Sequence, residues 1–481
     1  MLIMDDLLEP KKRLGMFITD DFLLDTKWSR KLYHEVAAEL PIIDYHAHLP
    51  PADIAARKKF RNIAELWLGS GNYCDHYKWR IMRACGVPER LITGDAPDRD
   101  KFLAFCRILP LAAGNPVLHW SHLELKRLFG IDSIINADSG PRLWDELNER
   151  LAGMDTWSFL TDARVEVSCT TDDPADDLAP HAALARSSLQ TRVLPAYRPD
   201  KAMRIENPGF VEYLGRLGHA ANVEIGSFAG LLRALEARVE YFHDHGGRAS
   251  DHALDATLPP TIPDDATVER LFTRRLAGET LTGEERGQYT AALLLHLGRA
   301  YARKGWTMCL HIGALRNTNS RGLATLGPDT GFDTIAEATI AVPLARLLDS
   351  LDNEGLLPKT MLFCLNPSMN AVLSVMAGCF QDGSVAGKLQ FGPAWWFNDH
   401  KDGNLEQMRL LANHGALGTF VGMVTDSRSF AAFPRHDYFR RLLCRLIGQW
   451  VEDGEYPADP HALETLVRGV SYANAKSYFA F

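Results

Sequence analysis

The chain has 481 residues, of which 46% are apolar and 23% are charged, a composition typical of a globular protein. Its net charge of -9, from 52 basic and 61 acidic residues, gives no support for binding to nucleic acids or anionic membranes. No run approaches 18 apolar residues and the first 16 residues lack the apolar core of a signal peptide, so we expect a cytoplasmic protein without a membrane span.

The first strand-like run ends in two histidines one residue apart, in Asp44-Tyr45-His46-Ala47-His48. Alternate residues of a strand face the same side, so both imidazoles would project from its carboxyl end. Pro50-Pro51 then stops the strand. Two neutral imidazoles on one face form half of a divalent metal site. The alternative is a polar loop end that binds nothing.

Seven further apolar runs end in polar residues, and they span 163–170, 192–198, 248–252, 306–311, 360–366, 389–392 and 419–426. Apolar residues recur at helical spacing in 228–243, 289–303, 340–351 and 438–451. Strands that alternate with helices form parallel βαβ units. Eight such strands predict an α/β fold, a closed (β/α)₈ barrel, in which chemistry collects at the carboxyl ends of the strands.

These runs divide the chain into three parts. Residues 1–51 hold an N-terminal segment and the first barrel strand. Residues 52–160 are far too many for one crossover and have a helical pattern, so we expect a helical insertion subdomain over the barrel mouth. Residues 161–481 complete the barrel, with a smaller insertion near 255–287 that is rich in Pro, Asp, Thr and Glu.

Asp426 ends the last of these runs. In a closed barrel the last strand lies beside the first, which would place Asp426 next to His46 and His48 as an anionic third ligand. The alternative is an N-cap of the next helix. No lysine occurs between Lys201 and Lys304, which excludes a lysine-bridged pair of metals on the fourth strand and favours one ion.

Three arginines follow the third, fifth and eighth runs and would ring the same mouth: Arg198, Arg316 and Arg428. Guanidinium groups bind carboxylates through paired hydrogen bonds, so we expect a small substrate that carries a carboxylate. The alternative is structural pairing with nearby acids such as Asp200.

The insertion contains Asp75-His76-Tyr77-Lys78-Trp79-Arg80. On a helix, the adjacent His76 and Tyr77 would diverge by about 100°. They would reach a substrate only if a loop or a helix end presents them. The alternative is an ordinary core or surface position.

The eight cysteines form no C-x-x-C pair, and several lie in apolar runs, so we expect buried, reduced thiols. They are Cys74, Cys85, Cys106, Cys169, Cys309, Cys364, Cys379 and Cys444.

Together these motifs make the chain resemble the uronate isomerases (glucuronate isomerase), members of the amidohydrolase superfamily. The matching stretches run through nearly the whole sequence, at 44–48, 75–80, 169–174, 198–200, 248–252, 310–314, 395–399 and 425–430. The resemblance implies a distorted (β/α)₈ TIM-type barrel with a helical insertion subdomain after strand 1. It also implies interconversion of D-glucuronate with D-fructuronate and of D-galacturonate with D-tagaturonate.

The resemblance carries site residues over by motif position. His46, His48 and Asp426 would bind one divalent ion, with Zn²⁺ favoured by this donor set and Mn²⁺ as the alternative. Catalysis would use Tyr77, His76, Asp426 and Arg198, and substrate binding would use Asp251, His311, Arg316, Trp395 and Arg428. Thr318 departs from the family pattern, which has Asn at that position of the loop after Arg316.

The implied reaction moves a proton from C2 to C1 of an open-chain uronate through an enediol. It needs a base, stabilisation of the developing oxygen charge and exclusion of water. Tyr77, assisted by His76 or an arginine, is the candidate proton carrier. Because the pKa of a free tyrosine is about 10, it needs cationic neighbours to act as a base.

Two alternative hypotheses about function remain. A mononuclear metal-dependent hydrolase would use Asp426 to deprotonate a metal-bound water, although the three arginines and the full motif set argue against it. A sugar-acid-binding protein without catalysis is the second. We expect no partner other than a small sugar acid and further copies of the chain, as a homo-oligomer.

Overall fold

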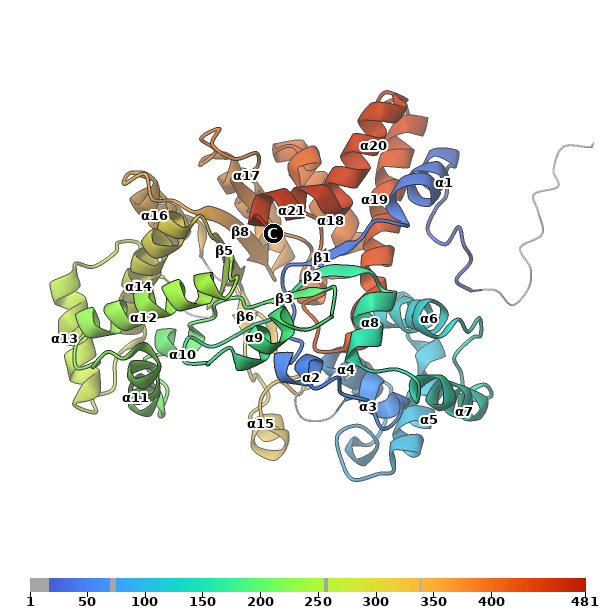
Figure 1. Cartoon of the computed structure of the whole chain (residues 1–481), viewed down its shortest axis with the longest axis horizontal. Coiled ribbons are helices and arrows are strands. Elements are labelled where there is room, and N and C mark those ends of the chain that lie inside the picture. Colours follow the sequence, from blue (N-terminus) through green and yellow to red (C-terminus); the bar gives the residue numbers. More distant parts are fainter. Residues whose placement is uncertain (1–16, 70–74, 255–257, 338) are drawn as a thin grey trace, which may run out of the picture.

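The computed structural model describes residues 17–69, 75–254, 258–337 and 339–481. Parallel strands surround the centre of this described part (Figure 1). They are β1 (Ile42–Asp44), β2 (Val165–Cys169), β3 (Arg192–Leu194), β4 (Ala249–Leu254), β5 (Thr307–Ile312), β8 (Lys359–Cys364) and β9 (Leu389–Phe391). Backbone ladders join β1–β2–β3 and β4–β5–β8–β9, and bridges from Tyr197 to Asp172 and to Ser250 connect the two sheets. The first seven predicted runs therefore contain strands in the expected order.

The predicted eighth strand, residues 419–426, is wrong as a strand, because this segment has no regular ladder. Gly422 and Asp426 have φ values of 79° and 47°, which interrupt extended backbone. The segment still lies beside the end of β1, since the Thr425 N–H donates to the Asp44 carboxylate at 2.9 Å and the Asp426 N–H donates to the His46 carbonyl at 3.1 Å. Toward β9 the connection runs through the Gln390 side chain, whose Nε2 donates to the Thr419 carbonyl at 3.0 Å. The ring is thus completed in a distorted form.

The strands are buried on both faces, as parallel sheets generally are. All six residues of β5 are buried. Cys309 belongs to the cluster inside the ring, with Met361 and Phe363 of β8. The alternating Met308 and Leu310 belong to the cluster on the outside, where helices cover the sheet.

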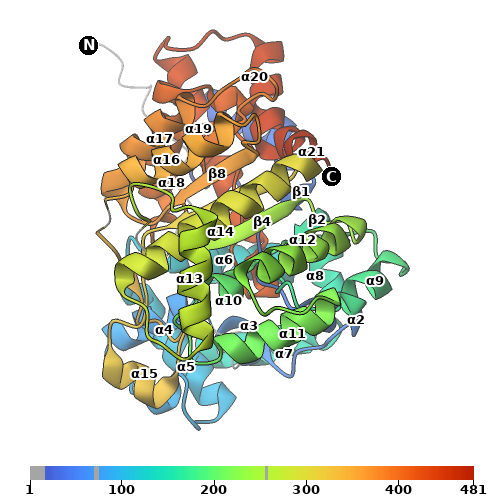
Figure 2. The same ribbon diagram turned by 90° about the vertical axis from the view of Figure 1, so that its left-hand side faces the viewer.

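The covering helices follow the strands along the chain. Figure 2 shows α12 (Phe228–Asp244), α13 (Asp265–Leu276) and α14 (Gly283–Lys304) in front of β4. The predicted helices at 228–243, 289–303, 340–351 and 438–451 are confirmed as α12, α14, α16 and α19, except that Ile340 is the N-cap of α16 and not part of it. The helices after β2 are α9 (Ala179–Ala185), α10 (Asp200–Met203), α11 (Phe210–Ala221), α12 (Phe228–Asp244), α13 (Asp265–Leu276), α14 (Gly283–Lys304), α15 (Ser320–Leu326), α16 (Ala341–Asp352), α17 (Asn370–Gly378), α18 (Lys401–His414), α19 (Pro434–Glu452), α20 (Pro460–Arg468) and α21 (Asn474–Phe479).

The helix and strand predictions do not include two features of this region. The smaller insertion near 255–287 contains α13 and the start of α14, while residues 255–257 lie outside the described residues. A two-stranded antiparallel pair, β6 (Ala314–Leu315) and β7 (Thr334–Ile335), flanks α15.

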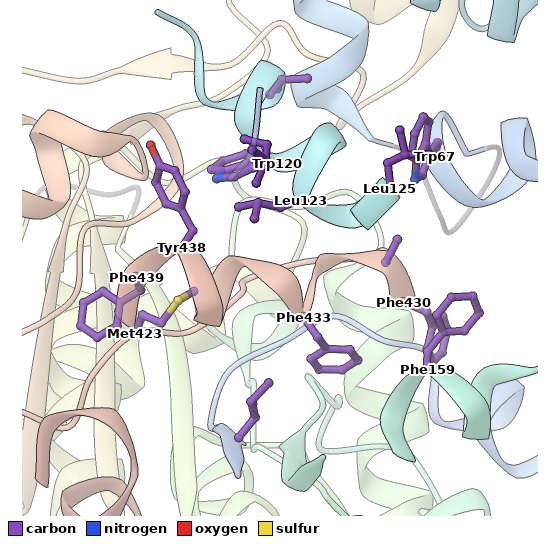
Figure 3. Close-up of a cluster of buried hydrophobic side chains, with 14 of the residues drawn as sticks. Trp67, Trp120, Leu123, Leu125, Phe159, Met423, Phe430, Phe433, Tyr438 and Phe439 are labelled. Atoms are coloured by element: carbon purple, nitrogen blue, oxygen red, sulfur yellow. The ribbon is translucent and has the colours of Figure 1, made fainter. Parts of the chain in front are cut away.

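A helical insertion follows strand 1, as predicted (Figure 1). Its helices are α2 (Pro51–Ala55), α3 (Ile63–Trp67), α4 (His76–Ala84), α5 (Asp98–Ile108), α6 (Pro116–Phe129), α7 (Gly140–Leu151) and α8 (Thr156–Asp162). Figure 3 shows Trp120 and Leu123 of α6 on the same side of the α19 ribbon as Tyr438, and Phe433, the N-cap of α19, belongs to the same apolar cluster. The short N-terminal helix α1 (Lys27–Leu32) also packs on α19. The insertion therefore shares one apolar core with both ends of the described chain.

The cysteines within the described residues are all free. Cys106, Cys169, Cys309, Cys364 and Cys444 are buried as expected. The expectation is wrong for Cys379, which is exposed at the C-terminal end of α17, and Cys85 is partly exposed. Cys74 lies outside the described residues. No described helix combines the length and apolar character that a membrane span requires.

Candidate functional site

A cavity of about 720 Å³ opens at the carboxyl ends of the barrel strands, under the insertion. Its walls come from both parts of the chain, which agrees with the expected position of the chemistry in this fold. The lining includes nearly all of the predicted site residues: His46, His48, His76, Tyr77, Arg198, His311, Arg316, Trp395, Asp426 and Arg428. Asp251 does not line it; its residue is 1% exposed and lies behind the imidazoles.

The two predicted histidine ligands and Asp426 come together at one oxygen atom. Nε2 of His46 lies 3.0 Å from Oδ1 of Asp426, and Nε2 of His48 lies 2.9 Å from the same oxygen. Metal–ligand bonds of about 2.0–2.2 Å in a tetrahedral site would separate neighbouring ligand atoms by about 3.3–3.6 Å, slightly more than these distances. The donor set and its spacing therefore fit a divalent cation.

The prediction that His46 and His48 end a strand is only partly correct, because β1 ends at Asp44 and both histidines follow it. Beyond this end the chain bends at His46, and backbone hydrogen bonds hold it on both sides. The Ala47 N–H donates to the Cys169 carbonyl at 3.0 Å, and the His48 N–H donates to the Ser427 carbonyl at 2.9 Å. Both imidazoles therefore reach the same Asp426 oxygen, as predicted, although neither belongs to the regular strand from which this was predicted.

Asp426 is held in an unusual conformation. A non-glycine residue with φ of 47° is uncommon and persists where its surroundings hold it. The Trp395 indole N–H donates to its second carboxylate oxygen at 2.7 Å. The tryptophan that was predicted to bind substrate thus also fixes the direction of the predicted metal ligand.

His46 also belongs to a second buried cluster, which contains Asp251 and His311. Asp251 Oδ1 lies 2.7 Å from His311 Nδ1, and its Oδ2 lies 3.8 Å from His46 Nδ1. The Arg198 guanidinium donates to the same Oδ2 at 2.9 Å. These three side chains could form a second cation site on geometry alone. The neighbouring guanidinium opposes a second cation, so Asp251 is better placed to orient the two imidazoles.

The electrostatics keep His48 and Asp426 in the protonation states of metal ligands. Burial lowers the pKa of His48 to about 4, which leaves a neutral imidazole. Burial acts to lower the pKa of His46 as well, but Asp251 and Asp426 outweigh it and the pKa is raised. For Asp426, burial acts to raise the pKa, but hydrogen bonds with His46 and His48 hold it well below its ordinary value. Asp426 is therefore a carboxylate.

His76 and Tyr77 occupy the first turn of α4, which begins after Asp75. The Asp75 carboxylate caps the helix by accepting from the Lys78 backbone N–H at 3.0 Å. The expected divergence of His76 and Tyr77 is wrong, since their rings stack with centroids 4.5 Å apart. Side chains in a first turn lean back beyond the helix end, so both can enter the cavity.

The two rings differ in their chemistry. Burial and the neighbouring Arg428 lower the pKa of His76 to about 4, which leaves it neutral. Burial and Asp426 raise the pKa of Tyr77 well above 10, against the opposing effect of the Arg435 cation. The resting phenol is therefore protonated and offers an O–H group to the cavity.

The three predicted arginines are all paired with acids. Arg198 donates from Nε to Asp200 at 2.8 Å, in addition to its bond with Asp251. Arg316 donates to Asp333 at 3.1 Å, and Arg428 donates to Asp329 at 3.1 Å. Each also lines the cavity, so structural pairing and substrate binding are both available to them.

Sequence reasoning missed a charged wall beside Tyr77. Arg435 of α19 lies over the Trp120 ring at 4.4 Å, and Trp120 meets the Tyr77 ring edge-on at 5.8 Å. Lys78 pairs with Asp75 at 2.8 Å. Glu124 also lines this wall, and burial raises its pKa to about 7. The sequences of α6 and α19 have the pattern of ordinary amphipathic helices. Only the folded structure shows that these two helices meet beside Tyr77.

Comparison with known proteins gives a consistent result along nearly the whole chain. The family model described as glucuronate isomerase matches residues 14–479. The uronate isomerase of Caldicellulosiruptor saccharolyticus is 51% identical over 97% of this chain and 99% of its own length. That of Bacillus licheniformis is 49% identical over 97% of this chain and 98% of its own length. The crystal structure of uronate isomerase from Thermotoga maritima is 35% identical with a TM-score of 0.89, covering 96% of this chain and all of that one.

Proposed function

The chain belongs to the glucuronate isomerase family, and we propose that its cavity converts hexuronates between their aldose and ketose forms. The substrates are D-glucuronate, which gives D-fructuronate, and D-galacturonate, which gives D-tagaturonate. The observation that supports this site most directly is the convergence of His46, His48 and Asp426 beside Tyr77 and the arginines.

The reaction needs two proton movements and no other reactant. One proton leaves C2 and returns to C1, and the hydroxyl proton on O2 is exchanged for one on O1. The aldehyde at C1 then becomes a hydroxymethyl carbon, and C2 becomes a carbonyl. Both movements need donors and acceptors within hydrogen-bond reach of the substrate, in a site that excludes water.

His46, His48 and Asp426 would hold a divalent cation, which we propose is Zn²⁺ rather than Mn²⁺ on the basis of the donor set. When bound, such an ion would supply a Lewis acid for the substrate's oxygen atoms. Trp395 keeps the Asp426 carboxylate aimed at this position. Asp251, held by Arg198, keeps His46 and His311 oriented.

Tyr77 is the proposed proton carrier between C2 and C1, with His76 as its neutral neighbour. Its resting phenol is protonated, so the phenolate that accepts the C2 proton requires stabilisation by nearby cations. Arg435 in the wall and Arg428 in the mouth can supply this stabilisation. Asp426 relays the hydroxyl proton between O2 and O1.

Arg316 and Arg428 are the proposed contacts of the substrate's carboxylate. Both guanidinium groups line the mouth, and carboxylates are their best-matched ligands. Arg198 acts behind them, because two of its bonds already hold Asp200 and Asp251.

The test is incubation of the purified full-length protein with each hexuronate in heavy water, followed by NMR and mass spectrometry. We expect ketose signals that grow at the expense of the aldose, with any mass change explained by incorporated deuterium. Hydrolysis of an amide or ester with no conversion of uronate would favour the hydrolase alternative. Binding of uronate without ketose formation or deuterium incorporation would favour a binding protein.

We also infer a cytoplasmic location and a homo-oligomer. Free buried thiols support a reducing compartment. Exposed apolar side chains on α16 and α17, namely Val342, Val372 and Val375, support a surface that other copies could cover. Light scattering at several protein concentrations tests the assembly, and a monomer at all of them would contradict it.

A further inference from the structure

Asp329 places a carboxylate at the mouth of the cavity, between two of the arginines proposed to bind substrate. Its Oδ2 lies 3.1 Å from Nη2 of Arg428, and its Oδ1 lies 3.9 Å from Nη1 of Arg316. The side chain is 45% exposed and lines the cavity. A carboxylate from this chain therefore already occupies the space that suits the carboxylate of a hexuronate.

The loop that carries Asp329 is fixed to the insertion. Arg83 of α4 donates to the Thr330 carbonyl at 2.5 Å, and Arg80 donates to the Asp333 carbonyl at 2.7 Å. The Phe332 ring lies under the Arg83 guanidinium at 4.6 Å. Because the backbone next to Asp329 is held in this way, exchange at the arginines requires movement of one side chain rather than of the loop.

Asp333 provides a contrast within the same loop. It also contacts Arg316, at 3.1 Å, but its second oxygen accepts from the Asn317 backbone N–H at 2.7 Å. Its residue is only 5% exposed. Asp333 is thus a fixed partner of Arg316, whereas Asp329 faces the cavity and solvent.

We propose that Asp329 is a displaceable counter-ion, which holds the place of the substrate's carboxylate between Arg316 and Arg428 and so sets the affinity of the site for anions. This inference rests on the proposed function. In the empty site, Asp329 offsets guanidinium charge that would otherwise attract unrelated anions. A hexuronate brings its own carboxylate together with hydroxyl groups and replaces Asp329 at the arginines. A neutral hexose lacks the group that makes this exchange.

The experiment uses the full-length Asp329→Asn variant, which keeps the side chain's shape and removes its charge. Partly exposed ion pairs are weak, so we expect KM for D-glucuronate to fall by about threefold, with kcat within about twofold of wild type. Inorganic phosphate serves as a second probe of the two guanidinium groups. We expect calorimetry to show about threefold tighter phosphate binding by the variant.

The control is Glu206→Gln, which removes a negative charge from another part of the same cavity. An equal effect of this control would assign the change to general charge and overturn the proposal. A higher KM in Asp329→Asn would overturn it too, since Asp329 would then support substrate binding. So would unchanged KM and unchanged phosphate binding. If wild type converts no uronate, the proposed function fails, whereas phosphate binding still decides the role of Asp329.

Discussion

Single side chains at the carboxyl ends of the strands determine what this cavity can bind. Asp426 is the central one, because its left-handed backbone and its bond from Trp395 direct one carboxylate oxygen at both His46 and His48. A strained residue that is fixed on several sides is typical of a functional position. The protein therefore pre-arranges the donor atoms, and loss of any one of them should directly weaken metal binding.

The first prediction concerns His48. His48→Asn removes one of three converging donor atoms, so we expect the purified variant to contain much less divalent metal and to lose at least about 100-fold in kcat/KM. Elemental analysis and a uronate conversion assay measure the two effects. His461→Asn, a substitution of an exposed histidine on α20, is the control. Equal metal content in the His48 variant and wild type would reject the ligand assignment.

The second prediction concerns Tyr77. Tyr77→Phe keeps the ring that stacks on His76 and removes only the hydroxyl group. We expect loss of hydrogen exchange at C2 and a decrease in kcat of about 10²–10⁴-fold, with substrate binding nearly unchanged. Deuterium incorporation followed by NMR, together with calorimetric binding of uronate, checks both parts. Turnover at the wild-type rate would remove Tyr77 as the proton carrier.

At the scale of elements, α19 connects regions that are far apart in the chain. It packs against α1, and its N-terminal end meets α6 of the insertion (Figure 3). The same two helices, α6 and α19, bring Trp120, Glu124 and Arg435 into the wall beside Tyr77. Apolar packing outside the cavity therefore holds the charged groups inside it.

The third prediction tests this packing. Leu123 of α6 is 1% exposed in the shared core, so Leu123→Ala should destabilise the protein by about 2–5 kcal/mol through the cavity that it leaves. Urea unfolding monitored by circular dichroism measures the change. Leu111, in the same insertion but 71% exposed, gives the matched control, and Leu111→Ala should change stability by less than about 0.5 kcal/mol. Equal effects of the two substitutions would contradict the shared core.

At the scale of the whole molecule, buried acids make stability depend on pH. Asp172 lies outside the main cavity and accepts from the Thr170 hydroxyl at 2.7 Å. Burial raises its pKa in the folded protein to about 7, above the unfolded value of about 3.9. The unfolded chain therefore releases this proton first as the pH rises, and the contribution of Asp172 to stability falls between about pH 4 and pH 7.

The fourth prediction follows from this sign. Asp172→Asn cannot ionise, so relative to wild type it should gain up to a few kcal/mol of stability between about pH 4 and pH 7. The difference in urea midpoint at several pH values measures the gain. Asp95→Asn, at an exposed aspartate, is the control and should show no such trend. A difference between the Asp172 variant and wild type that stays constant across this range would count against a raised pKa at this site.

The sequence by itself indicated the order of the first seven strands, the insertion after strand 1 and most of the candidate site residues that the structure places in the lining of the cavity. These features are local, since the alternation of apolar and polar residues reports which face of an element is buried. Polar residues at strand ends then converge because parallel strands share one carboxyl edge. For the same reason, the sequence predicts that His46, His48 and Asp426 lie close together, although 378 positions separate His48 from Asp426.

Only the tertiary structure decided how the last segment closes the ring, which acids pair with the arginines and what surrounds Tyr77. Gly422 (φ 79°) lies against the Val470 backbone carbonyl, and Asp426 (φ 47°) is held by the His46 carbonyl, so both positions depend on contacts with distant parts of the chain. Asp329 and Arg435 come from a loop and a helix with no local signal of function. Their positions depend on how distant parts of the chain pack together, and hydrophobic periodicity carries no information about such contacts.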